Sequence, residues 1–386
     1  MAHRRKNVLL LVNESIGICR GILRGVFSYA IPAKPWVLQE ASVNLDVMKL
    51  DAYKSADGAI VFGANPRLLH DLPSRGIPIV NVSGHCEDSA FPRVLPDNDA
   101  IGRDAARFFL GKGYRTFAMW TQPWSHYARM RQEAFVDEIG KDGHSVKIFF
   151  QTEAPGKSGP RVRDDAIAEL TQWTRFQDEP VALFSVTDLE GVFASHALYY
   201  AGIKVPNEVA ILGVDNEELK CAIAYPPLSS IAIPGQKIGY EAAAMLERMM
   251  SGADPQPKDI LLPPAGVIER ESTRTQAVHD PAVAAAMQYI QDHAHERISV
   301  TNVLSAVDVC RSTLERKFRA ELNRTPLEEI HRAHLDQAKR MLVETDRTLA
   351  EVATGCGYRD AAHLIMHFRK QTGKTPSEYR RAFLLK

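Results

Sequence analysis

The chain has 386 residues, enough for two or three domains, and its 47 basic and 47 acidic side chains cancel. The charge is uneven: residues 285–386 hold 17 Lys and Arg against 13 Asp and Glu, so the end is basic and the rest acidic. The apolar run at residues 8–12 is too short for a signal-peptide core or a membrane span, and the five cysteines are scattered. These features exclude a disulfide framework and a membrane protein, and they predict a cytoplasmic, nucleoid-associated protein.

Short apolar runs alternate with amphipathic stretches through the first 275 residues. The runs predict buried strands at residues 8–12, 59–62, 77–82, 117–120, 181–186 and 209–214. The stretches between them predict helices at residues 17–30, 101–110, 128–139, 164–176, 189–201 and 236–250. This alternation indicates parallel sheets covered by helices, and the length suits two lobes. We therefore expect a two-lobed α/β domain over residues 1–275.

Polar residues follow several of the predicted strands. They form the pairs Asn13-Glu14, Asp97-Asn98, Thr187-Asp188 and Asp215-Asn216. Ligands of open parallel sheets bind beyond the carboxyl ends of the strands. Carboxylates and amides suit a polyhydroxylated ligand, because each hydroxyl group both donates and accepts a hydrogen bond. The sequence thus predicts a sugar-binding cleft.

Motifs spread over residues 7–272 support this interpretation. They are Asp97-Asn-Asp-Ala-Ile-Gly102, Gly111-Lys-Gly113, Arg131-Gln-Glu-Ala-Phe135, Thr187-Asp188 and Leu212-Gly-Val-Asp215. Their order and spacing resemble the effector core of the lactose-repressor family, which is similar to periplasmic sugar-binding proteins. The resemblance implies that sugar hydroxyls are held by Arg131, by Thr187 or Asp188, and by Asp215, with Asp97 at the cleft.

Other residues complete the expected effector site. Asn13 and Asn216 join it from the strand ends, and Trp124, Tyr127 or Trp120 would offer a stacking face. Two structural alternatives stay open. Asp215 could cap the next turn, and Arg131 could pair with a neighbouring acid on a solvated face.

The last hundred residues contain a duplicated pattern, at about residues 298–320 and 348–371. Phe318 and Phe368 are fifty positions apart, and each lies four residues after a leucine, so each Leu–Phe pair shares a helix face that should be core. Each copy closes on Thr-Pro. Gly357 marks the turn of the second copy, and Asp308 stands at that place in the first. The pattern predicts two helix-turn-helix units, each laying one helix in the major groove of DNA.

A connector helix is expected between the units, from Pro326 through Val343. Eighteen residues at about 1.5 Å each span roughly 27 Å. Half-sites on one face of B-DNA lie about 34 Å apart. A rigid connector of this length could therefore place two recognition helices in successive major grooves.

Residues 283–383 resemble the AraC/XylS family of bacterial transcription regulators, through the run Ser312-Thr-Leu-Glu-Arg-Lys-Phe318 and the two Thr-Pro closures. The resemblance places a DNA-binding domain at residues 276–386. The expected DNA-binding residues are Arg311, Ser312, Glu315 and Arg316 in the first unit and Ala362, His363, Ile365, Met366, Arg369 and Lys370 in the second. Met366 stands where the family usually has Arg. The apolar face of the second unit could contact thymine methyl groups but cannot make bidentate bonds to guanine.

An effector core followed by an AraC-type domain resembles bacterial xylose-responsive regulators, which implies D-xylose as effector and activation of pentose-catabolic genes. The expected partners are double-stranded operator or promoter DNA, the sugar, a second copy of the chain and RNA polymerase, with no membrane. We expect sugar to close the lobes and thereby change how a dimer presents its DNA-binding domains. The stretch at residues 255–264 could carry part of this coupling.

Other functions are disfavoured. Gly-x-Ser-x-Gly, His-Glu-x-x-His and dinucleotide-binding motifs are absent, so we do not expect an enzyme. His363 and His367 have a spacing found in zinc sites, but no third ligand is evident, and we expect no metal or cofactor. A transport binding protein is opposed by the missing export signal and the DNA-binding tail. A different pentose, or repression, stays open as an alternative.

Overall fold

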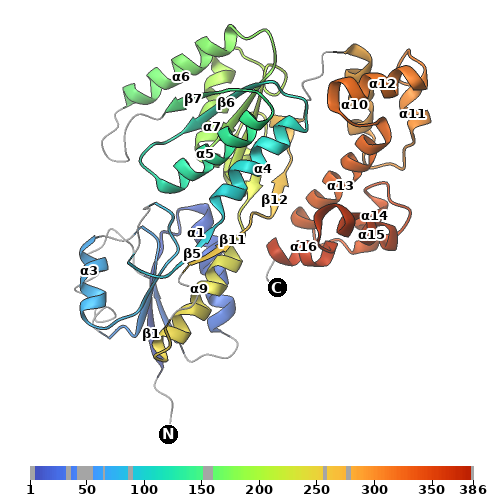
Figure 1. Cartoon of the computed structure of the whole chain (residues 1–386). Coiled ribbons are helices and arrows are strands. Elements are labelled where there is room, and N and C mark those ends of the chain that lie inside the picture. Colours follow the sequence, from blue (N-terminus) through green and yellow to red (C-terminus); the bar gives the residue numbers. More distant parts are fainter. Residues whose placement is uncertain are drawn as a thin grey trace.

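The computed structural model describes residues 5–31, 36–40, 55–63, 66–85, 90–150, 160–254, 259–274 and 280–383. Two α/β lobes form the first part of the chain, and a helical domain lies beside the second lobe (Figure 1). The expected fold class is therefore confirmed. The expected boundary between residues 275 and 276 lies outside the described residues.

The first lobe is built on a six-stranded sheet in the order β11-β5-β4-β3-β1-β2, and its neighbouring strands run parallel. The strands are β1 (Lys6–Leu11), β2 (Trp36–Glu40), β3 (Gly58–Val61), β4 (Ile79–Asn81), β5 (Arg93–Pro96) and β11 (Asp259–Leu262). The helices are α1 (Gly17–Ala30), α3 (Pro66–Ser74) and α9 (Gly235–Met250). Residues 8–11 and 58–61 are buried on both sheet faces, which explains why these strands are continuous apolar runs.

The second lobe has a six-stranded sheet in the order β12-β10-β9-β8-β6-β7, in which only the β10–β12 pair is antiparallel. The strands are β6 (Thr116–Thr121), β7 (Val146–Phe150), β8 (Val181–Ser185), β9 (Val209–Asp215), β10 (Ser229–Ala232) and β12 (Gly266–Ile268). The helices are α4 (Asn98–Leu110), α5 (His126–Lys141), α6 (Pro160–Arg175), α7 (Asp188–Tyr200), α8 (Glu218–Ile223) and the short η2 (Glu271–Thr273).

The described backbone passes between the lobes after β5, after β10 and between β11 and β12. At the first crossing, the backbone N–H of Asp97 donates to the carbonyl oxygen of Leu262 at 2.8 Å, so two crossing segments lie side by side. The second half of the stretch at 255–264 thus runs between the lobes. Segments that cross in parallel form a hinge about which two lobes can rotate.

Seven labelled helices form the described C-terminal domain. They are α10 (Pro281–Asp292), α11 (Val300–Leu304), α12 (Arg311–Leu322), α13 (Pro326–Glu344), α14 (Leu349–Thr354), α15 (Ala361–Thr372) and α16 (Pro376–Phe383). One apolar cluster packs α10–α12 against the start of α13, and another packs α14–α16 against the rest of α13. Because both clusters share α13, this helix is the common support of the two units.

The two helix-turn-helix units repeat in detail. Leu314 and Phe318 of α12 and Leu364 and Phe368 of α15 are fully buried, as expected. Both helices end on a left-handed residue, Asn323 (φ 51°) or Gly373 (φ 72°), and each is followed by a Thr–Glu capping box.

The turns of the two units differ. Gly357 has φ of 71°, as expected, and a side chain there would meet His334 and the carbonyl oxygen of Glu296. Asp308 is not among the residues with positive φ, so the expectation that it takes the same conformation was wrong. The units also differ in spacing: the N-caps Ser299 and Thr348 are 49 residues apart, whereas α12 and α15 begin 50 residues apart. The additional residue of the second unit lies in α14, because six residues separate the two helices in both units.

Close contact between helix backbones holds the first lobe together. An added Cβ at Gly239 of α9 would overlap the carbonyl oxygen of Ile22 in α1, and one at Gly25 of α1 would overlap that of Gln236. The two helices therefore pack at a distance that only glycine permits.

Replacing Gly239 by Ala should destabilise the protein by about 1–3 kcal/mol, because the helices must separate to admit the methyl group. Gly140→Ala is the matched control, since no atom lies within 4 Å of a Cβ at that helical position. It should raise stability by about 0.5–1 kcal/mol through helix propensity. Urea unfolding measures both, and equal midpoints for the two variants would contradict the packing argument.

Candidate functional site

Arg131 is buried at the inner side of α5, with 3% of its surface exposed. Its Nε donates to Oδ1 of Asn98 at 3.0 Å, and its Nη1 donates to the carbonyl oxygen of Val186 at 2.5 Å. The guanidinium lies over the ring of Tyr127, 4.9 Å from the centroid. A buried cation held by these neutral groups keeps its charge available for nearby acids, so the solvated ion-pair alternative does not apply.

Asp215 is the principal acid facing Arg131. Burial raises its pKa to about 7; Arg131 opposes this shift, while the carboxylates of Glu190 and Glu217 add to it. Arg131 and Asp215, both described, form no direct ion pair within 4 Å of each other. Each influences the pKa of the other. The pair can therefore offer a cation and an acceptor to a hydroxyl group placed between them.

The backbone at this acid is strained. Asp215 has φ of 111° and Asn216 has φ of 51°, conformations that cost non-glycine residues about 1–3 kcal/mol each. The N–H of Asn216 donates to the hydroxyl of Ser230 at 2.9 Å, and its Oδ1 accepts from Nη2 of Arg270 at 2.9 Å. These bonds hold the loop in a conformation that orients the Asp215 carboxylate.

Asp188, the first residue of α7, binds the same loop through its carboxylate. Its Oδ1 accepts from Ser230 at 2.6 Å, and its Oδ2 accepts from the N–H of Glu217 at 2.8 Å and from the thiol of Cys221 at 3.5 Å. Gly213 is required there, since a side chain would meet Asp188. Protein donors occupy both oxygens of Asp188, which is 1% exposed, so its expected role as a sugar ligand is corrected to a positioning role.

Contacts between the lobes close the cleft. Arg20 of α1 forms an ion pair with Glu217 at 2.8 Å. On the other side, the carbonyl oxygens of Gly84 and His85 accept from the N–H groups of Tyr127 and His126 at 3.0 and 2.9 Å. The His85 ring meets the Tyr127 ring edge-on at 5.3 Å. The lobes are thus joined on both sides of the Arg131–Asp215 pair.

The remaining residues that were expected to bind the effector lie at strand ends, at a helix cap, in a loop and in the apolar core. Asn13 lies at the end of β1, where its Oδ1 accepts from the N–H of Ser15, and Thr187 donates its hydroxyl to Glu190. Asp97 caps α4, its Oδ1 accepting from Ala100 at 2.9 Å. Trp124 is half-buried in the loop before α5. Trp120 is 1% exposed within the apolar core, so the expectation that it could stack on a sugar was wrong.

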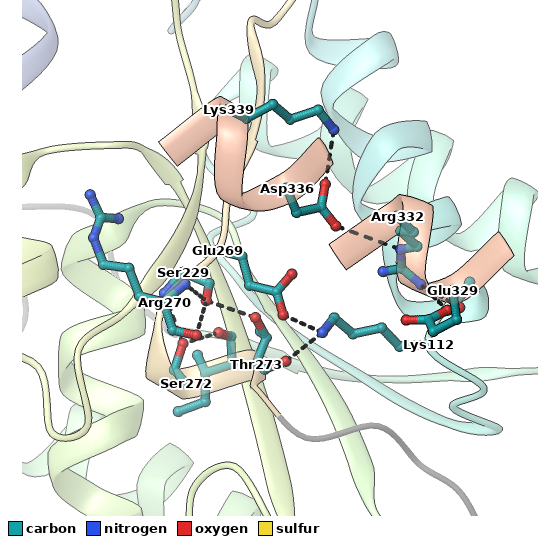
Figure 2. Close-up of polar contacts among 12 residues, drawn as sticks. Lys112, Ser229, Glu269, Arg270, Ser272, Thr273, Glu329, Arg332, Asp336 and Lys339 are labelled. Atoms are coloured by element: carbon teal, nitrogen blue, oxygen red, sulfur yellow. Dashed lines mark hydrogen bonds and ion pairs between the residues drawn. The ribbon is translucent and has the colours of Figure 1, made fainter. Parts of the chain in front are cut away.

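A charged junction joins the second lobe to the C-terminal domain (Figure 2). Lys112, which is 1% exposed, donates to Glu269 and to the carbonyl oxygen of Thr273 at 2.7 Å. The carbonyl oxygen of the preceding Gly111 accepts from Nη1 of Arg332 in α13 at 3.0 Å. A corner of the second lobe therefore binds both the end of β12 and the connector helix.

Further contacts run along α13. Asp336 lies 3.7 Å from Arg332 and 3.1 Å from Lys339, and although burial alone would raise its pKa, Lys339 and Arg332 hold that pKa below its usual value. Val343 packs on an apolar cluster of the second lobe: Ala232, Ala265 and Ile268. Polar and apolar contacts together hold α13 along β12.

Two adjacent residues after β12 contact different parts of the protein, the junction and the loop that carries Asp215. Glu269 binds Lys112 at the junction, whereas Arg270 donates to Asn216 at 2.9 Å and to the carbonyl oxygen of Leu228 at 3.0 Å in the cleft loop. Arg270 has extended backbone (φ −131°), in which successive side chains point to opposite faces. One short segment thus contacts both the Asp215 loop and the junction.

The exposed faces of the two recognition helices differ. On α12, Arg311, Ser312 and Arg316 are exposed, and Arg311 pairs with Glu315 at 2.9 Å. On α15, one open face of the helix is formed by Ala362, Ile365, Met366, Arg369 and Lys370.

His363 does not belong to that face. Its ring meets Tyr358 edge-on at 5.5 Å, and its Nδ1 is buried. The neighbouring His367 accepts or donates a bond to Tyr358 at 2.9 Å. His363 is half-buried beside the core leucine, and its expected contact with DNA stays a prediction. In the described part of the chain, no three His, Cys, Asp or Glu residues gather as metal ligands.

Comparisons with known proteins match both parts of the chain. Residues 106–273 match a periplasmic binding protein-like domain, and residues 304–382 match a helix-turn-helix domain. The xylose operon regulatory protein of Escherichia coli is 30% identical over 98% of both chains. That of Haemophilus influenzae is 30% identical over 98% of this chain and 99% of its own.

The chain belongs to the family of xylose operon regulatory proteins. A solved structure of the xylose-binding transcription activator xylR, 28% identical, superposes with a TM-score of 0.63 over 98% of this chain and 99% of that one. A member of this family is a sugar-responsive, DNA-binding transcription regulator, and these relatives are regulators rather than enzymes. None of the described helices is long and apolar enough to cross a bilayer.

Some residues of the cleft and junction were not foreseen. Glu190, Glu217 and Arg20 shape the charge around Asp215, and Lys112 and Arg270 join the parts of the protein. A partial signal existed for Lys112, since it lies within the motif Gly111-Lys-Gly113, which carried the family resemblance.

Proposed function

We propose that this protein is a cytoplasmic, D-xylose-dependent activator of pentose-catabolic genes. The buried Arg131 opposite Asp215 supports a hydroxyl-rich ligand, because a fixed cation and a carboxylate can bind both lone pairs and protons of hydroxyl groups. The relatives named for the xylose operon, and the one described as xylose-binding, supply the choice of pentose and the direction of regulation.

Sugar would act by favouring lobe closure. Asn13 belongs to the first lobe, whereas Arg131, Thr187 and Asp215 belong to the second, so only a closed cleft offers both sets of contacts to one ligand. The Arg20–Glu217 pair and the His85–Tyr127 contact close the same gap without sugar. A ligand therefore has to add only a modest preference for the closed form.

The segment after β12 would transmit this closure. Arg270 contacts the Asp215–Asn216 loop, and Glu269 contacts Lys112, whose neighbour Gly111 holds α13. A shift of the cleft loop can thus reach the connector helix through two adjacent residues. We propose this route as the principal connection, with residues 259–264 contributing to the hinge.

DNA would be bound by α12 and α15 in successive major grooves. The α13 helix has 19 residues, or about 28 Å at 1.5 Å each, and both apolar clusters are built on it. The proposed contacts are Arg311, Ser312, Glu315 and Arg316 in the first unit and Ala362, Ile365, Met366, Arg369 and Lys370 in the second. As an activator, the bound protein would also contact RNA polymerase.

We further propose that two copies bind repeated half-sites. Large apolar side chains are exposed over α7 and α8, namely Tyr199, Tyr200, Leu219, Ile223 and Tyr225, and such clusters on soluble proteins mark interfaces. Sedimentation of the full chain should show a dimer, and Tyr200→Glu should shift it toward monomer. A monomer at all concentrations and with saturating xylose would remove this part of the proposal.

The decisive experiment is calorimetry of the full chain against a panel of pentoses and hexoses. D-xylose should bind most tightly, and Asp215→Ala should weaken it by roughly tenfold or more, because a hydrogen bond to a charged group contributes about 1.5–3 kcal/mol. Arg316→Ala should weaken DNA binding and leave sugar affinity unchanged. Turnover of the pentose would favour an enzyme, tighter binding of another pentose would change the effector, and repression in a reporter assay would reverse the proposed sign.

The route through Arg270 has its own test. Xylose should change DNA affinity by roughly 5–150-fold, equivalent to a coupling of about 1–3 kcal/mol. In Arg270→Met this factor should fall toward one, because the bonds to Asn216 and Leu228 are lost. Arg274→Met is the matched control, since Arg274 pairs only locally with Glu271 at 3.0 Å among the contacts described.

A second variant approaches the same route from the junction. Glu269→Gln leaves the cleft contacts in place and weakens the bond to Lys112, so it should preserve xylose affinity while reducing the coupling. Full coupling in both Arg270→Met and Glu269→Gln, measured by fluorescence anisotropy of labelled DNA, would rule out this segment as the transmission path.

A further inference from the structure

The second recognition helix presents an apolar face where a DNA-reading face is expected. Ala362, Ile365 and Met366 form this apolar face, and Arg369 and Lys370 border it one turn further along α15. Met366 is 66% exposed, although the neighbouring Leu364 and Phe368 are fully buried. Met366 therefore contributes nothing to the core that would explain a large apolar side chain at this place.

The first recognition helix gives the reference for this face. Residues fifty positions apart occupy the same place in α12 and α15, since both helices span twelve residues and bury Leu and Phe at matching positions. The counterparts of Ala362, Ile365 and Met366 are Ser312, Glu315 and Arg316. Three side chains that form hydrogen bonds are thus replaced by two aliphatic side chains and a thioether, which has no donor and accepts only weakly.

The chemistry of the major groove limits what such a face can recognise. All four bases present hydrogen-bonding groups there, and thymine alone adds a 5-methyl group. An apolar side chain pressed against a donor or acceptor leaves that group without a partner, which is unfavourable. Contact with the thymine methyl group instead buries apolar surface on both sides.

We propose that Ile365 and Met366 read thymine 5-methyl groups, so that the half-site of the second unit is selected by methyl contacts and that of the first by hydrogen bonds. The occupant is duplex DNA, because the basic side chains of Arg369 and Lys370 adjoin the apolar face, and such side chains bind phosphates. This inference rests on the proposed DNA-binding function and adds the specificity of one of its two units.

The test uses full-length protein with xylose and a randomised DNA duplex pool. A duplex selected from the pool is resynthesised with deoxyuridine in place of thymidine, which removes the methyl group and keeps the base pair. Substitution in the second half-site should weaken binding about fourfold per contacted methyl, the factor that corresponds to about 0.8 kcal/mol per buried methylene-sized group. The same substitution in the first half-site, which Arg316 is proposed to contact, should weaken binding less.

Two variants separate methyl reading from other roles of the apolar face. Met366→Arg restores the residue type of the first unit, and it should remove the sensitivity to deoxyuridine at the base pair that Met366 reads and enrich guanine at that place in a fresh selection. Met366→Leu conserves volume and apolar character, so it should keep the sensitivity.

The outcomes are distinct. Failure to select any sequence would overturn the proposed function together with this inference. A selected duplex that binds equally well with deoxyuridine in the second half-site would overturn the inference alone. Undiminished sensitivity of Met366→Arg at every thymine of the second half-site would also overturn only the inference. So would a Met366→Arg variant that keeps its DNA affinity while transcription by purified RNA polymerase falls, which would assign the apolar face to a protein partner.

Discussion

The position of the DNA-binding domain depends on one buried charge, the ammonium group of Lys112. Burial lowers the pKa of this lysine, and the carboxylate of Glu269 opposes that shift. A buried charge that loses its partner typically costs about 3–5 kcal/mol, so Lys112 and Glu269 must move together or not at all. Because Gly111 holds α13 through Arg332, this constraint extends to the helix on which both recognition helices are built. The junction is therefore specific in orientation, and the packing of Val343 on the second lobe adds to it.

The segment after β12, which carries Glu269 and Arg270, also explains why backbone strain is concentrated at Asp215. A loop with two non-glycine residues at positive φ is stable only while its surroundings determine it, and here Asp188, Ser230 and Arg270 do so. Each of these residues also limits how the loop can respond to a ligand. A change at Asp215 cannot relax locally, because its neighbour Asn216 is bonded to Arg270. The hydrogen bonds of Asp188, Ser230 and Arg270 thus hold the Asp215–Asn216 loop in its strained conformation. The bond from Arg270 also links this loop to the segment that reaches the junction.

The local sequence pattern was enough to predict the strands that are buried on both faces. It was not enough to predict the strands that form only by pairing with distant parts of the chain. The apolar runs of β1, β8 and β9 were recognisable as strands. The β10 strand begins with Ser229 and Ser230, and β11 joins the first lobe from far along the chain by pairing with β5, so neither had a local signature. The motifs found Arg131 and Asp215. They did not reveal that Asp188 is occupied by protein donors, nor the Arg20–Glu217 pair across the cleft, since sequence separation of 197 residues carries no pattern.

Duplication left the two DNA-binding units alike in what folding requires and different in what recognition uses. The buried Leu and Phe, the left-handed C-cap and the Thr–Glu capping box all recur, because each satisfies a packing or backbone demand that does not depend on the ligand. The exposed face has no such demand, so Arg316 and Met366 can differ without cost to the fold. Because α13 rigidly joins the units, the polar unit can set register on a duplex while the apolar unit tests the neighbouring groove. Two unlike faces on one support can also distinguish the two directions of a DNA site, which two identical faces could not.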